Sequence, residues 1–128
     1  MVLDILIAED EPAILESLEF ILQRKGWSVA AVHDGEAALE ALVRLQPRVL
    51  LLDIMLPRKN GMDVLKTIRA QPELYQANVL VLTARGQRYD RKMASDLNAD
   101  GFITKPYSNS EVIAEVSRLL STPQIVAG

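Results

Sequence analysis

The sequence predicts one α/β domain in which a parallel β-sheet is covered by helices on both faces. The chain has 128 residues, which leaves room for one domain of ordinary size. Along the chain, short apolar runs of strand length alternate with stripes of helical period. Strict alternation of strand and helix is typical of a parallel sheet, because each helix carries the chain back to the same edge.

Five segments have strand character. Val49–Asp53 and Val79–Leu82 are continuous apolar runs, which suit central strands buried on both faces. The other three are shorter or interrupted by polar residues. In chain order, the predicted strands are Leu3–Ala8, Val29–Val32, Val49–Asp53, Val79–Leu82 and Gly101–Thr104.

The first three helices follow from apolar stripes between these strands. The first stripe consists of Ile14, Leu15, Leu18, Ile21 and Leu22, which lie on one helical face. Pro12 suits the first turn of this helix, and Gly26 stands just beyond its end. The second stripe runs over 38–45 before Pro47, and the third runs over 64–68 before Pro72.

Two more helices complete the alternation. Gln87–Leu97 is predicted as a helix from only three apolar side chains at a spacing of four. Val112–Leu120 has a stronger stripe, and Ser108 with Glu111 forms a capping-box pattern before it. The domain is therefore expected to occupy residues 1–121, with residues 122–128 as a short flexible tail.

Composition excludes several classes of function. The net charge is −3, whereas a nucleic-acid-binding domain of this size needs a basic surface. The absence of cysteine excludes disulfides and thiolate metal sites, and one histidine, His33, cannot build a histidine metal site. The chain also lacks a signal-peptide pattern and an apolar run long enough to span a membrane. We therefore expect a cytoplasmic protein that binds neither nucleic acid nor membrane.

Polar side chains follow four of the predicted strands: Glu9 and Asp10, Asp53, Thr83, and Lys105. Parallel strands end at one edge of the sheet, so these groups are expected to converge there. Clustered carboxylates repel unless a cation lies between them, and oxygen ligands without histidine or cysteine favour Mg²⁺. Asp53 is then placed to act as a nucleophile that forms an aspartyl-phosphate, with Lys105 on a phosphoryl oxygen.

Each of these residues also has an ordinary structural interpretation. Glu9 and Asp10 suit the first turn of a helix, where acids are favoured by the helix dipole. Thr83 alone suits a cap or turn, and Lys105 alone suits the surface. Asp53 is harder to explain structurally, because an unpaired buried acid is costly. The joint occurrence at successive strand ends favours the chemical interpretation.

Four segments resemble the motifs of response-regulator receiver domains of two-component signalling. They are Ile5–Glu11, Leu52–Pro57 followed by Asn60–Met62, Leu82–Arg85, and Ile103–Tyr107. The resemblance covers residues 3–121. It implies the doubly wound, flavodoxin-like fold of chemotaxis-type receivers, with five parallel strands in the order 2-1-3-4-5 and five helices.

The resemblance also implies roles for the clustered residues. Asp53 would accept a phosphoryl group from a sensor histidine kinase or a histidine phosphotransfer protein. Asp10, Asp53 and the backbone carbonyl of Met55 would bind Mg²⁺ directly, and Glu9 would act through water. Regulation by phosphorylation is then the function, and catalysis is limited to the chain's own phosphotransfer and dephosphorylation.

Further residues of the family pattern concern the switch. Thr83 and Lys105 would hold phosphoryl oxygens, and the Lys105–Pro106 bond would be cis. Phe102 would turn inward as Thr83 moves, and the signal would reach the face formed by the fourth helix, fifth strand and fifth helix. Three positions would modulate this switch or the lifetime of the phosphoryl group: Met55, Ala84 and Arg85.

The output of the domain is less defined by the sequence. Arg91 and Glu111 match the charged dimer face of DNA-binding regulators, which favours phosphorylation-dependent homodimers. Gly101, Glu115 and Ser117 depart from that pattern and weaken the expectation. The 128 residues hold a receiver without an effector domain, so we expect either a downstream protein target or a larger parent regulator.

Three alternative functions share parts of this pattern. An aspartate-nucleophile phosphatase of the haloacid-dehalogenase type needs a second aspartate two residues after the first, where this chain has Met55. A flavodoxin-like cofactor binder needs a phosphate loop after the first strand, where this chain has acids. The remaining alternative is a receiver that is never phosphorylated and serves only as an interaction module.

Overall fold

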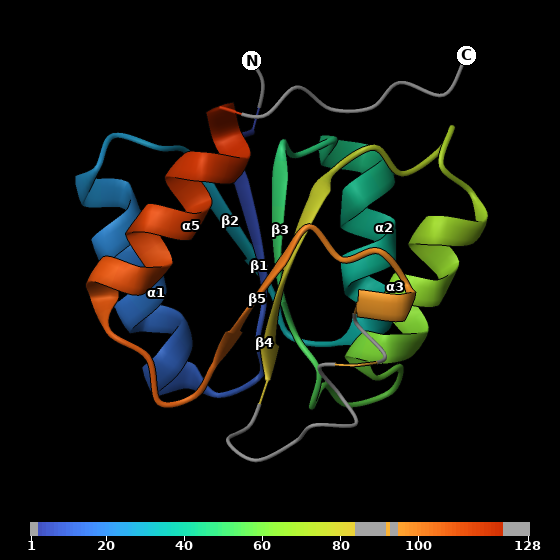
Figure 1. Ribbon diagram of the computed structural model, residues 1–128, viewed down its shortest axis with the longest axis horizontal. Helices are drawn as coiled ribbons and strands as arrows, with labels where there is room; N and C mark the ends of the chain where they lie inside the picture. The colour runs from blue at the N-terminus through green and yellow to red at the C-terminus, as the bar shows by residue number, and fades with distance from the viewer. Residues whose placement is uncertain (1–2, 84–91, 93–94, 122–128) are drawn as a thin grey trace.

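The computed structural model describes residues 3–83, 92 and 95–121 and has the predicted α/β architecture (Figure 1). The sheet contains five parallel strands in the order β2-β1-β3-β4-β5. The elements are β1 (Ile5–Ala8), α1 (Pro12–Arg24), β2 (Val29–Val32), α2 (Gly35–Leu45), β3 (Val49–Asp53), α3 (Gly61–Ala70), β4 (Asn78–Thr83), β5 (Gly101–Thr104) and α5 (Asn109–Ser121). The predicted strand order is confirmed.

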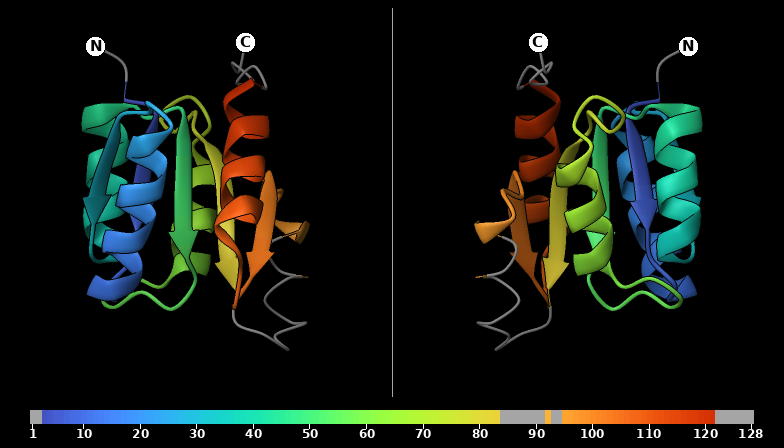
Figure 2. Two further views of the ribbon diagram at one scale, coloured as in Figure 1. Left: turned by 90° about the vertical axis from the view of Figure 1, so that its left-hand side faces the viewer. Right: turned by 90° about the vertical axis from the view of Figure 1, so that its right-hand side faces the viewer.

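Helices cover the sheet on both sides. α1 and α5 lie on one face, and α2 and α3 lie on the other (Figures 1 and 2). Residues of each central strand alternate between two apolar cores: in β3, Val49 and Leu51 face α1 and α5, whereas Leu50 and Leu52 face α2 and α3. All four side chains are fully buried, as the continuous apolar run predicts.

The helix ends follow the local sequence signals. Pro12 occupies the first turn of α1, and Gly26 follows the helix with a φ of +90°. At the start of α5, the backbone N–H of Ser108 donates to Glu111, and the N–H of Glu111 donates to the Ser108 hydroxyl. The predicted capping box is therefore confirmed.

Three strand boundaries differ from the prediction: the start of β1 and both ends of β4, which runs one residue further, to Thr83. β1 begins at Ile5 rather than at residue 3. Just before it, the Asp4 N–H donates to the Ser28 hydroxyl at 2.8 Å and the Ser28 N–H donates to the Asp4 carboxylate at 2.9 Å, while the Leu3 and Asp4 carbonyls still accept from the backbone of 48–49. β4 begins one residue earlier, at Asn78, whose buried amide donates to the Leu119 carbonyl at 2.9 Å. Polar side chains with partners elsewhere in the fold thus lie at strand ends that apolar runs alone delimit to within a residue or two.

Some predictions lie outside the described residues. These include most of the helix predicted over 87–97, the tail over 122–128, and the residues Ala84, Arg85 and Arg91. Four of the five predicted helices are accordingly seen in the described part of the chain. None of the helices in that part is both long and apolar enough to cross a membrane.

Candidate functional site

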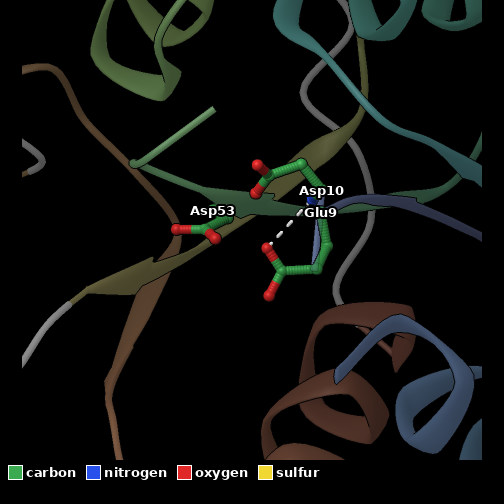
Figure 3. A group of neighbouring side chains, drawn as sticks. All are labelled: Glu9, Asp10 and Asp53. Atoms are coloured by element: carbon green, nitrogen blue, oxygen red, sulfur yellow. Dashed lines mark hydrogen bonds between the residues drawn. The ribbon is translucent and has the colours of Figure 1, made fainter. Parts of the chain in front are cut away.

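Three carboxylates meet at the carboxyl edge of the sheet (Figure 3). Glu9 and Asp10 follow β1, Asp53 ends β3, and one oxygen of each lies within 4.8 Å of the others. The pairing of β1 with β3 explains why these acids lie close together. Ile7 pairs with Leu51, and side chains two residues further along lie on the same face, so Glu9 and Asp53 are neighbours on that face. Glu9 and Asp53 are buried, at 0% and 4% exposure, whereas Asp10 is exposed.

Lys105 closes the cluster from the end of β5. Its Nζ lies 3.2 Å from Oδ2 of Asp53 and 3.5 Å from Oε1 of Glu9. The other oxygen of Asp53, Oδ1, accepts a hydrogen bond of 3.0 Å from the backbone N–H of Met55. The Lys105–Pro106 peptide bond is cis, as the resemblance implied. Asp53 is therefore held on both oxygens by positive or donor groups.

The two buried acids differ in their pKa. Burial raises the pKa of Glu9 to about 8, and the neighbouring Asp53 adds to that rise. Burial alone would also raise the pKa of Asp53, but protonated Glu9, the Met55 amide and the Lys105 charge together lower it. At neutral pH the pair therefore shares one proton, which resides on Glu9, and Asp53 carries the negative charge.

The charge of Lys105 completes this arrangement. Burial alone would lower the pKa of Lys105, but the negative charges of Asp53 and Glu9 outweigh it and raise the pKa above its usual value. An ionised carboxylate beside a fixed ammonium group provides a nucleophile and a partner for the negative charge of an incoming group.

The donor set fits a hard divalent cation. All three carboxylates offer oxygen, and the group contains neither histidine nor cysteine. The buried Oε1 of Glu9 accepts no hydrogen bond within the described structure, although Lys105 lies at ion-pair distance. Two carboxyl groups buried side by side are costly, and a cation with its bound water would offset that cost.

Thr83 ends β4 and Phe102 lies in β5, and each has contacts of its own. Thr83 is fully buried, and its hydroxyl contacts the Thr104 hydroxyl at 3.5 Å. Side chains alternate along β4, so Thr83 lies on the same face of the sheet as Val81. Asp53 lies on the other face. Phe102 is half-buried and packs against the core beneath α2 and α3. The contacts described here join Glu9, Asp10, Asp53 and Lys105, and the role predicted for Thr83 stays a prediction.

Three further residues from the sequence analysis, Met55, Glu111 and Glu115, lie on the surface or at a helix end. The side chain of Met55 is 71% exposed beside the site. Glu111, which matches a dimer-face position, is engaged in the capping box with Ser108. Glu115 forms an ion pair of 3.1 Å with Arg118 on the same helix.

Two glycines support the site: Gly61, which lies in the segment Asn60–Met62 that carries the family resemblance, and Gly35, which no sequence pattern indicated. A Cβ on Gly61 would lie 2.5 Å from the carbonyl oxygen of Asp53, and a Cβ on Gly35 would lie 1.8 Å from that of Lys59. In the sequence, Gly35 follows Asp34 after a strand, a pattern that signals only a turn. Their role comes from close approaches between distant segments.

Comparisons with known proteins identify related sequences and structures. The sequence model of the response regulator receiver domain matches residues 5–117. The alkaline phosphatase synthesis transcriptional regulatory protein PhoP of Bacillus subtilis is 37% identical over 96% of this chain and 50% of its own length. The transcriptional regulatory protein CpxR of Escherichia coli is 38% identical over 91% of this chain and 48% of its own length. The chain spans about half the length of these relatives.

Solved structures show the same fold. A response regulator from Chloroflexus aurantiacus superposes with a TM-score of 0.88 at 27% identity, covering 95% of this chain and all of the other. The receiver domain of a sensor histidine kinase from Pseudomonas aeruginosa gives a TM-score of 0.84 at 26% identity, with the same coverage. In that structure a magnesium ion is coordinated in the active-site cleft.

Proposed function

Because the chain belongs to the response regulator receiver domain family, we propose that it is a phosphorylation switch whose acceptor is Asp53. One observation carries the assignment: Asp53 is the buried carboxylate whose pKa is lowered, and its oxygens contact Lys105 Nζ and the Met55 amide. Glu9 has a raised pKa, and Asp10 is exposed with no such support among the described contacts.

The proposed donor is a sensor histidine kinase or a histidine phosphotransfer protein. A carboxylate oxygen of Asp53 attacks the phosphorus atom, and the bond between phosphorus and the donor's imidazole nitrogen breaks. The nitrogen keeps the bonding electrons, and an acyl phosphate forms on Asp53. Lys105 then faces an additional anion, and its ammonium group stabilises a phosphoryl oxygen.

Asp10, Asp53 and the Met55 carbonyl would hold Mg²⁺, with Glu9 acting through water. When bound, this ion neutralises negative charge on the transferring phosphoryl group. Glu9 must release its proton before it can accept hydrogen bonds from such water at both oxygens. The raised pKa of Glu9 therefore couples cation binding to the release of a proton.

The output is proposed to pass through Thr83 and Phe102. Among the described residues, the Thr83 hydroxyl contacts Thr104 at 3.5 Å, and a phosphoryl oxygen on Asp53 would offer it a stronger, charged acceptor. Movement of Thr83 would vacate volume beside the half-buried Phe102 on the same face of the sheet. The β5 and α5 surface would then change, and its partner is proposed to be a downstream protein or an effector domain.

Phosphorylation by acetyl phosphate tests the assignment. With Mg²⁺, intact-mass analysis should show one added phosphoryl group on the unchanged chain and on Asp63→Ala, which alters an exposed aspartate of α3. Asp53→Ala should remain unlabelled, and chelation of Mg²⁺ should suppress labelling of the unchanged chain. Equal labelling of Asp53→Ala and the unchanged chain means that the acceptor lies elsewhere.

Two alternatives are less well supported. An aspartate-nucleophile phosphatase lacks its second acid, because exposed Met55 occupies that position. A receiver that is never phosphorylated would not need an ionised Asp53 with Lys105 at 3.2 Å, an arrangement that is costly to bury.

A further inference from the structure

The loop between β3 and α3, residues 54–60, is held against the start of α2. The carbonyl oxygen of Pro57 accepts hydrogen bonds from the Gly35 N–H at 3.4 Å and from the Lys59 N–H at 2.8 Å. Gly35 is buried, and a Cβ there would lie 1.8 Å from the Lys59 carbonyl oxygen. Helix and loop can approach this closely only because residue 35 has no side chain.

The loop contains a strained turn at the point of contact. The hydrogen bond from Lys59 N–H to the Pro57 carbonyl closes a three-residue turn, and Arg58 at its centre has a φ of +66°. Turns of this kind with positive φ are rare and strained, and strain persists only where the surroundings fix it. Gly35 supplies such a restraint, because its N–H shares the Pro57 carbonyl.

The loop is also held at its α3 end and by two side chains that are buried in the core. The Gly61 N–H donates to the Ile54 carbonyl at 2.9 Å, and a Cβ on Gly61 would lie 2.5 Å from the Asp53 carbonyl oxygen. Ile54 and Leu56 are buried in the core beneath α2 and α3. Because the loop is held at both ends, a displacement of the Lys59 backbone has to be taken up by the few loop residues before it, which include Met55.

We propose that Gly35 is a positioning residue for the phosphorylation site, acting through the loop on the Met55 carbonyl and amide. An added Cβ forces the Lys59 carbonyl away by roughly 1 Å or more, and a shift of this size is enough to misplace a catalytic group severely. The inference rests on the proposed function, in which the Met55 carbonyl is a ligand of Mg²⁺. Gly35 itself contacts neither the cation nor the phosphoryl group.

The test compares Gly35→Ala with Gly26→Ala. Gly26 is a matched control, since it precedes β2 at the opposite edge of the sheet, and a Cβ there meets nothing within 4 Å although its φ of +90° disfavours alanine. Isothermal titration calorimetry measures Mg²⁺ binding to the unchanged chain and to each variant. The temperature is chosen so that urea unfolding curves show every variant to be folded before urea is added. Gly35→Ala should bind Mg²⁺ about tenfold or more weakly than the unchanged chain. Gly26→Ala should bind Mg²⁺ as the unchanged chain does.

Hydrogen exchange of the unchanged chain gives a second test that does not depend on the folding of a variant. Gly35 begins a helix, where N–H groups have no partner within the helix, so slow exchange of its amide reports the bond to Pro57. Fast exchange of that amide, or unchanged Mg²⁺ affinity in Gly35→Ala, would overturn the inference and leave the assignment of Asp53 intact. Failure of acetyl phosphate to label the unchanged chain refutes the proposed function instead.

Discussion

Replacing Glu9 by glutamine should stabilise the metal-free fold at neutral pH. Glu9 is fully buried, and its pKa rises from the usual 4.5 to about 8. Below pH 4.5 both the folded and the unfolded chain hold the proton on the Glu9 carboxyl group, so this group does not lower the free energy of unfolding. Between pH 4.5 and 8 only the folded chain holds it, so the free energy of unfolding falls as pH rises, and the loss is complete above pH 8.

The magnitude follows from the size of the shift. One proton corresponds to a slope of about 1.4 kcal/mol per pH unit, which gives a loss of about 3 kcal/mol at pH 7. The lowered pKa of Asp53 changes the free energy of unfolding only at pH values below the usual pKa of an aspartate. The raised pKa of Lys105 changes it only at pH values above the usual pKa of a lysine. Neither contributes between pH 5 and 8. Glutamine resembles the protonated carboxyl group but does not titrate, so Glu9→Gln removes this pH dependence of the free energy of unfolding.

Urea unfolding followed by circular dichroism at pH 5, 6, 7 and 8, with Mg²⁺ chelated, measures the effect. Glu9→Gln should flatten the pH dependence and be more stable than the unchanged chain at pH 7. Glu16→Gln, which alters an exposed glutamate of α1, serves as the control and should keep the original slope. If Glu9→Gln keeps that slope, Glu9 is ionised in the folded chain and the reasoning from burial is wrong.

Three further substitutions have defined outcomes. Lys105→Met removes the ammonium group 3.2 Å from Asp53, and the rate of labelling by acetyl phosphate should fall about a hundredfold; an unchanged time course in intact-mass analysis excludes the assigned role. Gly61→Ala places a Cβ 2.5 Å from the Asp53 carbonyl oxygen and should cost about 1–3 kcal/mol in urea unfolding, whereas an unchanged midpoint means the loop adjusts freely. Ser108→Ala removes one half of the capping box and should cost about 1 kcal/mol, while Ser117→Ala, on the exposed side of α5, should cost little.

Much of the fold could be predicted because its signals are local. The run Val49–Asp53 is apolar at every position except the last, and the structure buries all of it between two helical layers. The meeting of Glu9, Asp53 and Lys105 could also be predicted, since parallel strands end at one edge. Sequence alone did not show that Glu9 is buried while Asp10 is exposed, because this depends on the register between β1 and β3.

Other features depend on contacts between distant segments. The approach of Gly35 to Lys59 joins residues that are far apart in the sequence, and nothing near Gly35 indicates it. The exchange of hydrogen bonds between Asp4 and Ser28, just before β1 and β2, is likewise non-local. Thr83 could be placed at a strand end, but its orientation toward Thr104 follows from the pairing of β4 with β5.

The most direct test of the central claim is to locate the phosphoryl group on the phosphorylated chain. Reduction of the acyl phosphate with borohydride, followed by peptide mass spectrometry, marks the modified carboxylate covalently. We predict modification at Asp53 alone, because Asp53 is the buried carboxylate with a lowered pKa and Lys105 at its side. Modification at Glu9 or Asp10 instead of Asp53 would contradict the proposed mechanism.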